Sequence, residues 1–130
     1  MRRILFVLAI GCSAYAAGCG PDQRLLYAEE TARLSASAVT EVETAGGEDM
    51  PDALALPLER AHVRLDEVEQ SIEAWRDHSG SLAYRTHAPC LRAALIAVRD
   101  VLVAEGRNVP SDLDEAETML EDVADHTCAP

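Results

Sequence analysis

The chain has 130 residues, of which 11 are basic and 23 acidic, and its formal net charge is −12. This length indicates one domain, and an apolar fraction of 48% is high enough to form a core, which argues against wholesale disorder. The acidic balance excludes nucleic acid as a partner, because phosphate binding needs a basic surface. All the basic residues are arginine, and the chain contains no lysine.

Residues 1–20 have the pattern of a bacterial export signal. Arg2 and Arg3 form a positively charged N-terminal region, and an unbroken apolar run follows at residues 4–10. The run ends in small residues and is too short for a membrane-spanning helix. The segment therefore predicts a targeting signal that is not part of the fold.

Small residues end this signal immediately before a cysteine. Ala17, Gly18 and Cys19 match the last three positions of a lipobox, and Ala16 stands where leucine is usual. The N-terminus therefore resembles that of bacterial lipoproteins, which implies that residues 1–18 are removed and that Cys19 carries a diacylglycerol thioether. Such acyl chains hold a protein on a membrane, since each buried methylene contributes about 0.8 kcal/mol.

The resemblance also sets the expected location and boundaries. Gly20 stands where lipoproteins kept at the inner membrane have aspartate, which implies the outer membrane, facing the periplasm, in a Gram-negative cell. We expect a removed signal at 1–18, a lipidated tether at 19–24 and one helical domain at 25–130. Loss of two arginines would leave 9 basic (11 − 2) and 23 acidic residues, and thus a net charge of −14.

Two other processing sites fit the same segment. An ordinary signal peptidase would cut near Ala16, and an alternative lipobox would end at Cys12 after a shorter apolar run. Each alternative, like cleavage before Cys19, places the mature protein outside the cytoplasm.

The rest of the chain predicts four helices. Glycine, proline and polar clusters divide it into four segments, and each segment repeats apolar residues at spacings of three and four. The expected helices cover about 22–44, 57–78, 81–105 and 111–127, and the third starts at either Ser81 or Pro89. Short connections favour antiparallel neighbours, so we expect an all-α, up-down-up-down four-helix bundle. The apolar stripes expected in its core are Leu25, Ala28, Ala32, Ser35, Val39 and Val42; Leu58, Ala61, Leu65, Val68, Ile72 and Trp75; Leu91, Ala94, Leu95, Val98, Val101 and Leu102; and Leu113, Ala116, Leu120 and Val123.

Residues at the segment ends support this division. Pro57 suits the first turn of the second helix, where its missing N–H costs nothing, and Ser111 suits the N-cap of the fourth. Trp75 and Tyr84 lie at equal distances from the turn between the second and third helices, so we expect them to face each other. Three glycines lie where a helix ends in a residue with positive φ: Gly46, Gly80 and Gly106.

Cys90 and Cys128 give the clearest long-range signal. They remain once Cys12 is assigned to the signal and Cys19 to the anchor, and they lie at equal distances from Val109 in the last turn. An antiparallel hairpin therefore brings them together, and a cysteine pair outside the cytoplasm oxidises to a disulfide. On the chain-entropy model, closing this loop stabilises the fold by roughly 4 kcal/mol.

The same region offers a metal site as an alternative. His87, Cys90, His126 and Cys128 together would supply two nitrogen and two sulfur ligands for zinc. Their spacing matches no zinc motif, and an exported protein favours the disulfide.

No segment supplies catalytic chemistry, because nucleophile–base arrangements, glycine-rich phosphate loops and calcium loops are absent from the sequence. We therefore predict a non-enzymatic binding or accessory protein of the cell envelope, without a cofactor, whose partners are the membrane and a basic envelope protein. The alternative function is a periplasmic metal-binding or metal-sensing bundle that uses His62, His87 or His126 with carboxylates. The acidic residues either meet the basic partner as one face or only keep the protein soluble: Asp112, Asp114, Glu115, Glu117, Glu121, Asp122 and Asp125, with Glu67, Glu69 and Glu73.

Overall fold

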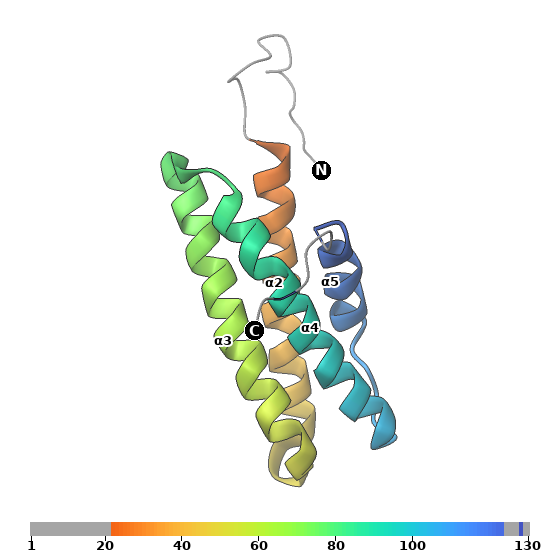
Figure 1. Ribbon diagram of the computed structural model, residues 1–130. Helices are drawn as coiled ribbons and strands as arrows, with labels where there is room; N and C mark the ends of the chain where they lie inside the picture. Colours follow the sequence, from red (N-terminus) through yellow and green to blue (C-terminus); the bar gives the residue numbers. More distant parts are fainter. Residues whose placement is uncertain (1–21, 124–127, 129–130) are drawn as a thin grey trace.

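The computed structural model describes residues 22–123 and 128 and confirms the all-α fold (Figure 1). Its four α-helices are α2 (Gln23–Gly46), α3 (Asp52–Ala74), α4 (Leu82–Ala104) and α5 (Ser111–Glu121). A 3-10 turn, η2 (Gly47–Asp49), follows α2, and a π-helical turn, η3 (Trp75–Ser79), follows α3. These described residues contain no strand.

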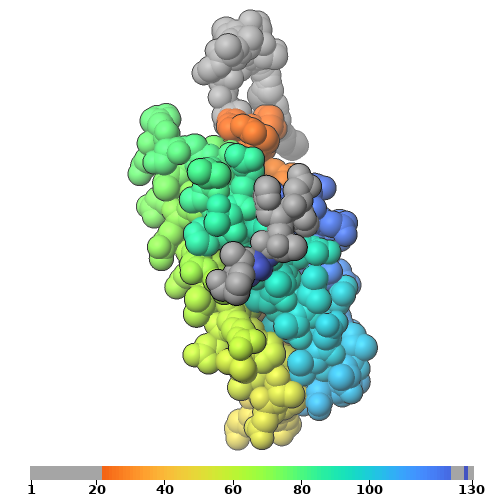
Figure 2. Space-filling view, in the orientation of Figure 1, coloured from red at the N-terminus to blue at the C-terminus, as the bar shows by residue number. Residues whose placement is uncertain are grey.

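The helices close into a ring in which each packs mainly against two neighbours. α2 packs against α3 and α5, and α4 packs against the same two helices. Short connections join consecutive helices, which run antiparallel, so the predicted up-down-up-down bundle is confirmed (Figure 1). α3 and α5 therefore lie diagonally across the ring, and Figure 2 shows them on opposite flanks of α4.

The predicted apolar stripes form the core of this ring. Almost every residue of the four stripes is buried, including Trp75 just beyond the end of α3. Leu25, Val101 and Val123 are the exceptions, since they pack against the core while staying half-buried at its margin. The spacing of apolar residues was therefore a reliable guide to which side of each helix faces inward.

Hydroxyl side chains are part of the core as well. Thr31, Ser35 and Ser71 are almost fully buried, and each hydroxyl donates a hydrogen bond to a backbone carbonyl one turn earlier, at 2.7–2.8 Å. The helix backbone thus satisfies these groups, which is why the core can bury them.

α3 begins earlier than predicted. We expected Pro57 in the first turn, but the helix starts at Asp52 and Pro57 lies in its second turn. A proline at this point forgoes one hydrogen bond to the carbonyl of Ala53. The added turn buries Leu54, which is 1% exposed, on the same side as Leu58, and this burial offsets the lost hydrogen bond.

α4 also contains a proline. The helix starts at Leu82 and continues through Pro89 to Ala104, so the earlier of the two predicted starts is correct and a start at Pro89 is wrong. The turns before the proline bury Tyr84 and Ala88. The free energy gained by burying these side chains outweighs the loss of the one backbone hydrogen bond that the proline cannot donate, so the helix continues through Pro89.

α5 is much shorter than predicted. We expected a helix up to residue 127, but it ends at Glu121, and residues 124–127 lie outside the described residues. Among the described residues beyond Leu120, only the half-buried Val123 continues the apolar stripe. At about 1.5 Å per residue, the 11 residues of α5 reach less than half the length of the 23-residue α4.

The helix ends agree in part with the sequence signals. Positive φ angles of 51°, 86° and 68° occur at Gly47, Gly80 and Gly106. The last two were predicted, whereas Gly46 stays helical and its successor takes the positive φ instead. Pro110 rather than Ser111 is the N-cap of α5, because the proline already holds the extended backbone that a cap requires.

A disulfide joins Cys90 of α4 to Cys128, as predicted. The sulfur atoms lie 1.98 Å apart and the Cα atoms 4.6 Å apart. Since the sequence separation is 38 residues, the closed loop includes all of α5. The bond therefore ties the end of the chain to α4 and limits how far α5 can leave the ring.

Removal of the disulfide should lower stability. We predict that the double variant Cys90→Ser/Cys128→Ser loses about 4 kcal/mol of unfolding free energy, as the chain-entropy model gives for a loop of this length. Urea unfolding followed by circular dichroism measures the loss. The wild-type protein in a reducing agent is the control and should unfold at the same urea concentration as the variant. Two free thiols at these positions in the native protein would contradict the account.

Candidate functional site

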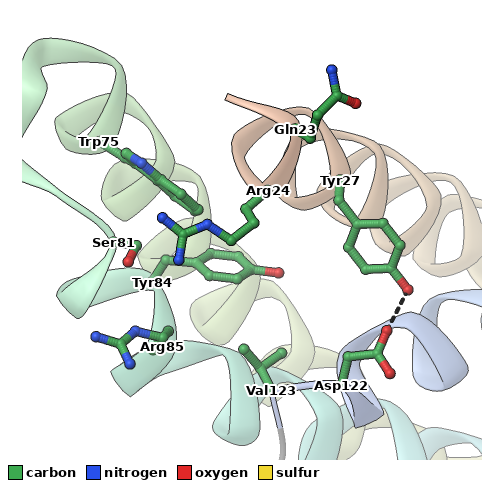
Figure 3. Close-up of a pocket in the computed structure, with 9 residues that line it drawn as sticks. All are labelled: Gln23, Arg24, Tyr27, Trp75, Ser81, Tyr84, Arg85, Asp122 and Val123. Atoms are coloured by element: carbon green, nitrogen blue, oxygen red, sulfur yellow. Dashed lines mark hydrogen bonds between the residues drawn. The ribbon is translucent and has the colours of Figure 1, made fainter. Parts of the chain in front are cut away.

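One pocket at the end of the bundle collects the aromatic side chains. Tyr27 of α2, Trp75 of η3 and Tyr84 of α4 all line it (Figure 3). They are the only tryptophan, tyrosine or phenylalanine residues after residue 20 of the sequence. The pocket volume of about 360 Å³ lies in the range of sites for small molecules. This aromatic pocket is therefore the main candidate site.

Trp75 and Tyr84 form the apolar wall of the aromatic pocket. Their ring centroids lie 5.7 Å apart, with 44° between the ring planes, which is a favourable arrangement for an aromatic pair. The two residues are 9% and 5% exposed. The prediction that they face each other across the turn between α3 and α4 is confirmed.

Tyr27 closes the pocket on the other side. Its hydroxyl donates a hydrogen bond to Asp122 Oδ2 at 2.8 Å, and Figure 3 shows this pair across the pocket from Trp75. The bond links the start of α2 to the first residue after α5. Tyr27 itself is 42% exposed, so it combines a contact inside the protein with a face open to solvent.

The aromatic pocket lies just beyond the end of the short α5. At this end of the bundle α2 begins, α3 ends and α4 begins, while α5 has already ended at Glu121. Asp122 and Val123, which follow α5, line the pocket together with residues of the three long helices. The pocket therefore lies at the level of the bundle where α2, α3 and α4 continue but α5 has ended.

Two arginines bring positive charge to the pocket. Arg24 and Arg85 both line it, and Figure 3 shows the guanidinium of Arg24 directed between Trp75 and Tyr84. Arg24 Nε lies 3.7 Å from the Asp22 carboxylate, but 76% of the arginine side chain is exposed, so this contact leaves most of the guanidinium open. Arg85 forms no ion pair with the other residues that the structure describes.

The tyrosines of the pocket stay protonated over the physiological pH range. Burial raises the pKa of Tyr84 to about 12, and burial together with the hydrogen bond to Asp122 raises the pKa of Tyr27. Neither phenol can act as a base at neutral pH, so the pocket offers apolar walls, neutral hydroxyls and guanidinium groups. These groups suit binding rather than proton transfer.

The structure does not assemble the alternative metal site. Cys90 and Cys128 are bonded to each other, so neither sulfur is a thiolate ligand. His87 Nδ1 lies 3.8 Å from Glu67 Oε1 on α3, and His126 lies outside the described residues. In the part of the chain that the structure describes, no three histidine, cysteine or acidic side chains gather to hold a metal ion.

His62, which was named for the alternative metal function, lies apart from the pocket. His62 Nε2 contacts Glu43 Oε2 at 2.9 Å across the surface between α2 and α3, and both side chains are about half exposed. Cys19, the expected lipid attachment point, lies outside the described residues.

Arginines of α4 contact part of the acidic run on α5. Arg99 lies 2.9 Å from Glu117, whose side chain is only 12% exposed, and 3.8 Å from Asp114. Arg92 lies 3.4 Å from Glu121. These contacts contribute to the packing of α5 on α4, although the side chains of Asp114 and Glu121 stay mostly exposed.

Carboxylates on α3 form a separate surface. Asp52, Glu59, Asp66 and Glu73 are exposed and recur every seven residues, so they lie along one side of the helix, with Glu69 one turn from its neighbours. We call these five carboxylates the α3 acidic stripe, and none of them forms an ion pair within the described residues. Because α3 and α5 lie diagonally across the ring, their carboxylates lie on different sides of it and not on one shared face, which was one of the two alternatives for the acidic residues.

We did not predict that Tyr27, Arg24 and Arg85 belong to one site. The available signal was topological, because an antiparallel bundle brings the start of its first helix to the turn that already holds Trp75 and Tyr84. No periodicity marks these residues, since they lie at helix ends rather than along a stripe.

No protein-family model, curated protein or solved structure matches this chain. Among the described residues, no helix has both the length and the apolar character needed to cross a membrane. The function must therefore be argued from the residues and their geometry.

Alkaline titration should separate Tyr84 from an ordinary tyrosine. We predict that it ionises near pH 12, whereas an unfolded tyrosine ionises near pH 10. Since its folded pKa is raised, the stability that its burial contributes is complete below pH 10 and falls as the pH rises from 10 to 12. Tyrosinate absorbance measures the ionisation, and Tyr84→Phe should remove only the late step. Ionisation of Tyr84 near pH 10 in the folded protein would contradict this environment.

Proposed function

We propose that this protein is a lipid-anchored, non-enzymatic binding or accessory protein of the bacterial cell envelope. The lipobox pattern of Ala17, Gly18 and Cys19 supports cleavage before Cys19 and lipidation at its sulfur. Gly20, in place of aspartate, supports an outer-membrane location in a Gram-negative cell. The disulfide between Cys90 and Cys128 is in keeping with an oxidising compartment.

The observation that carries this proposal is the position of the N-cap of α2. Asp22 caps α2 by accepting a hydrogen bond from the Arg24 backbone N–H at 2.9 Å. Cys19 is only three residues before this cap, and an extended chain covers about 3.3–3.6 Å per residue. An anchor at Cys19 would therefore hold the start of α2 within about 11 Å of the membrane surface.

An anchor at Cys19 would give the bundle a definite orientation. The end that carries the aromatic pocket would face the membrane, and the connections at 47–51 and 105–110 would point away from it. The flanks of the bundle would then be open to other proteins. Since arginines of α4 already contact three carboxylates of α5, the unpaired α3 acidic stripe is the surface that best suits a basic envelope protein.

Carbodiimide crosslinking in membranes tests the anchor and the partner in one preparation. The reagent joins carboxylates to lysine amines, and because this chain has no lysine, a crosslink from its carboxylates to a lysine must come from another protein. We expect a crosslinked partner that is lost in the triple variant Asp66→Asn/Glu69→Gln/Glu73→Gln. Mass spectrometry of the same material should find a diacylglycerol thioether on an N-terminal Cys19.

A matched variant controls for the loss of charge. Asp100→Asn/Glu105→Gln/Glu115→Gln removes the same number of exposed carboxylates from other parts of the surface and should keep the crosslink. Equal loss in both variants, or no crosslinked species at all, would exclude the α3 acidic stripe as the binding surface. An unmodified N-terminus beyond Cys19 would exclude the anchor.

A further inference from the structure

We propose that the aromatic pocket binds an anionic phospholipid, with an acyl chain against Trp75 and Tyr84 and the lipid phosphate at Arg24 and Arg85. This inference rests on the proposed lipid anchor, because an anchor at Cys19 is what brings the pocket to a membrane. It gives the end of the bundle a ligand of its own, distinct from the protein partner proposed for α3.

The walls of the pocket suit an acyl chain. Trp75 and Tyr84 line the pocket with the small part of each residue that stays exposed, 9% and 5%, and Val123 adds an aliphatic side chain at the other end. Aromatic residues with a polar atom are typical of proteins at the membrane–water interface, because the ring is apolar and the hydroxyl or indole N–H stays hydrated. At the same end of the bundle, Leu26 is 43% and Leu82 is 70% exposed, so apolar side chains already face outward there.

The rim of the pocket suits a phosphate. A guanidinium group binds phosphate oxygens through two parallel hydrogen bonds, and Arg24 and Arg85 reach the pocket from two different helices. α4 also begins here, with Ser81 lining the pocket and making no side-chain hydrogen bond to the helix start. The first N–H groups of α4 thus lie near the pocket and favour negative charge.

The carboxylates near the pocket are already engaged. Asp122 accepts the hydrogen bond of Tyr27, and Asp22 accepts the backbone N–H that caps α2. Both carboxylates keep their charge when they accept these hydrogen bonds, so Arg24 and Arg85 offer guanidinium groups to a phosphate without giving the pocket a net positive charge.

A phospholipid fits this pocket better than a second copy of the chain or a peptide. The pocket lies at the end of the bundle where α2 begins, only four residues after Cys19. With Cys19 in a bilayer, lipid headgroups would be the molecules nearest to the opening at all times. A second copy of the chain also carries a net negative charge, but it has no phosphate group that the two arginines could bind.

Fluorescence of Trp75 tests the proposal directly, because it is the single tryptophan of the chain. The protein purified from its membranes is reconstituted in vesicles of equal parts phosphatidylglycerol and phosphatidylcholine. In one set bromine atoms are placed on the acyl chains of phosphatidylglycerol, and in the other on those of phosphatidylcholine, so that composition and charge are identical. Bromine quenches tryptophan only near contact, so the difference between the sets reports which lipid lies against Trp75.

We expect several-fold stronger quenching when bromine is on phosphatidylglycerol, because each arginine close to anionic headgroups favours them about fivefold. The double variant Arg24→Gln/Arg85→Gln should abolish this difference. Arg33→Gln/Arg60→Gln, which removes two exposed arginines elsewhere on α2 and α3, should keep it. Circular dichroism should show equal helix content in both variants.

Equal quenching by the two brominated lipids, or a difference that survives in the Arg24→Gln/Arg85→Gln variant, overturns the proposal. Unchanged Trp75 fluorescence in both vesicle sets also overturns it and leaves a second copy or a peptide as the occupant. Failure of the proposed anchor is seen separately, since the protein would then not float with the vesicles. In that case short-chain phosphatidylglycerol in solution, compared with short-chain phosphatidylcholine, must shift the emission of Trp75 for the lipid site to stand.

Discussion

The apolar stripes of this chain can leave water only when four helices close into a ring, but the ring is uneven in length. α2, α3 and α4 have 23 or 24 residues each, whereas α5 has 11. α5 completes the ring near the connection that follows α4 and stops before the other end. The rest of the structure depends on this mismatch, because it leaves a space at the far end in which every aromatic side chain after residue 20 is found.

An ion pair and a disulfide hold the short α5 in place in addition to the burial of its few apolar side chains. Glu117 contacts Arg99, and the disulfide from Cys90 to Cys128 closes the chain over α4. Arg92 and Arg99 of α4 thus contact three carboxylates of α5, of which Glu117 is the most buried. The carboxylates of α3 have no such partners among the described residues, so the two acidic segments have different roles although they look alike in the sequence.

The sequence predicts the fold well because helical periodicity depends on burial along each helix, and nearly all the stripe residues are buried. It also predicts the disulfide and the contact between Trp75 and Tyr84, since both follow from antiparallel pairing around a turn. Helix ends are predicted less well. Pro57 and Pro89 are tolerated inside helices because burial of neighbours such as Leu54 outweighs one lost hydrogen bond. The aromatic pocket could not be predicted, because it depends on where α5 ends, and no local pattern near Glu121 marks that point.

The central claim is that the end of the bundle with the aromatic pocket faces the membrane. Nuclear magnetic resonance of the protein in lipid nanodiscs that contain a gadolinium-labelled headgroup lipid tests it most directly, because paramagnetic broadening falls steeply with distance and α2 alone is about 36 Å long at 1.5 Å per residue. The account predicts that the backbone amide signals of Arg24, Ser81 and Arg85 are broadened, while those of Gly47 and Gly106 at the other end stay sharp. Uniform broadening, or broadening centred on Gly47 and Gly106, would contradict it.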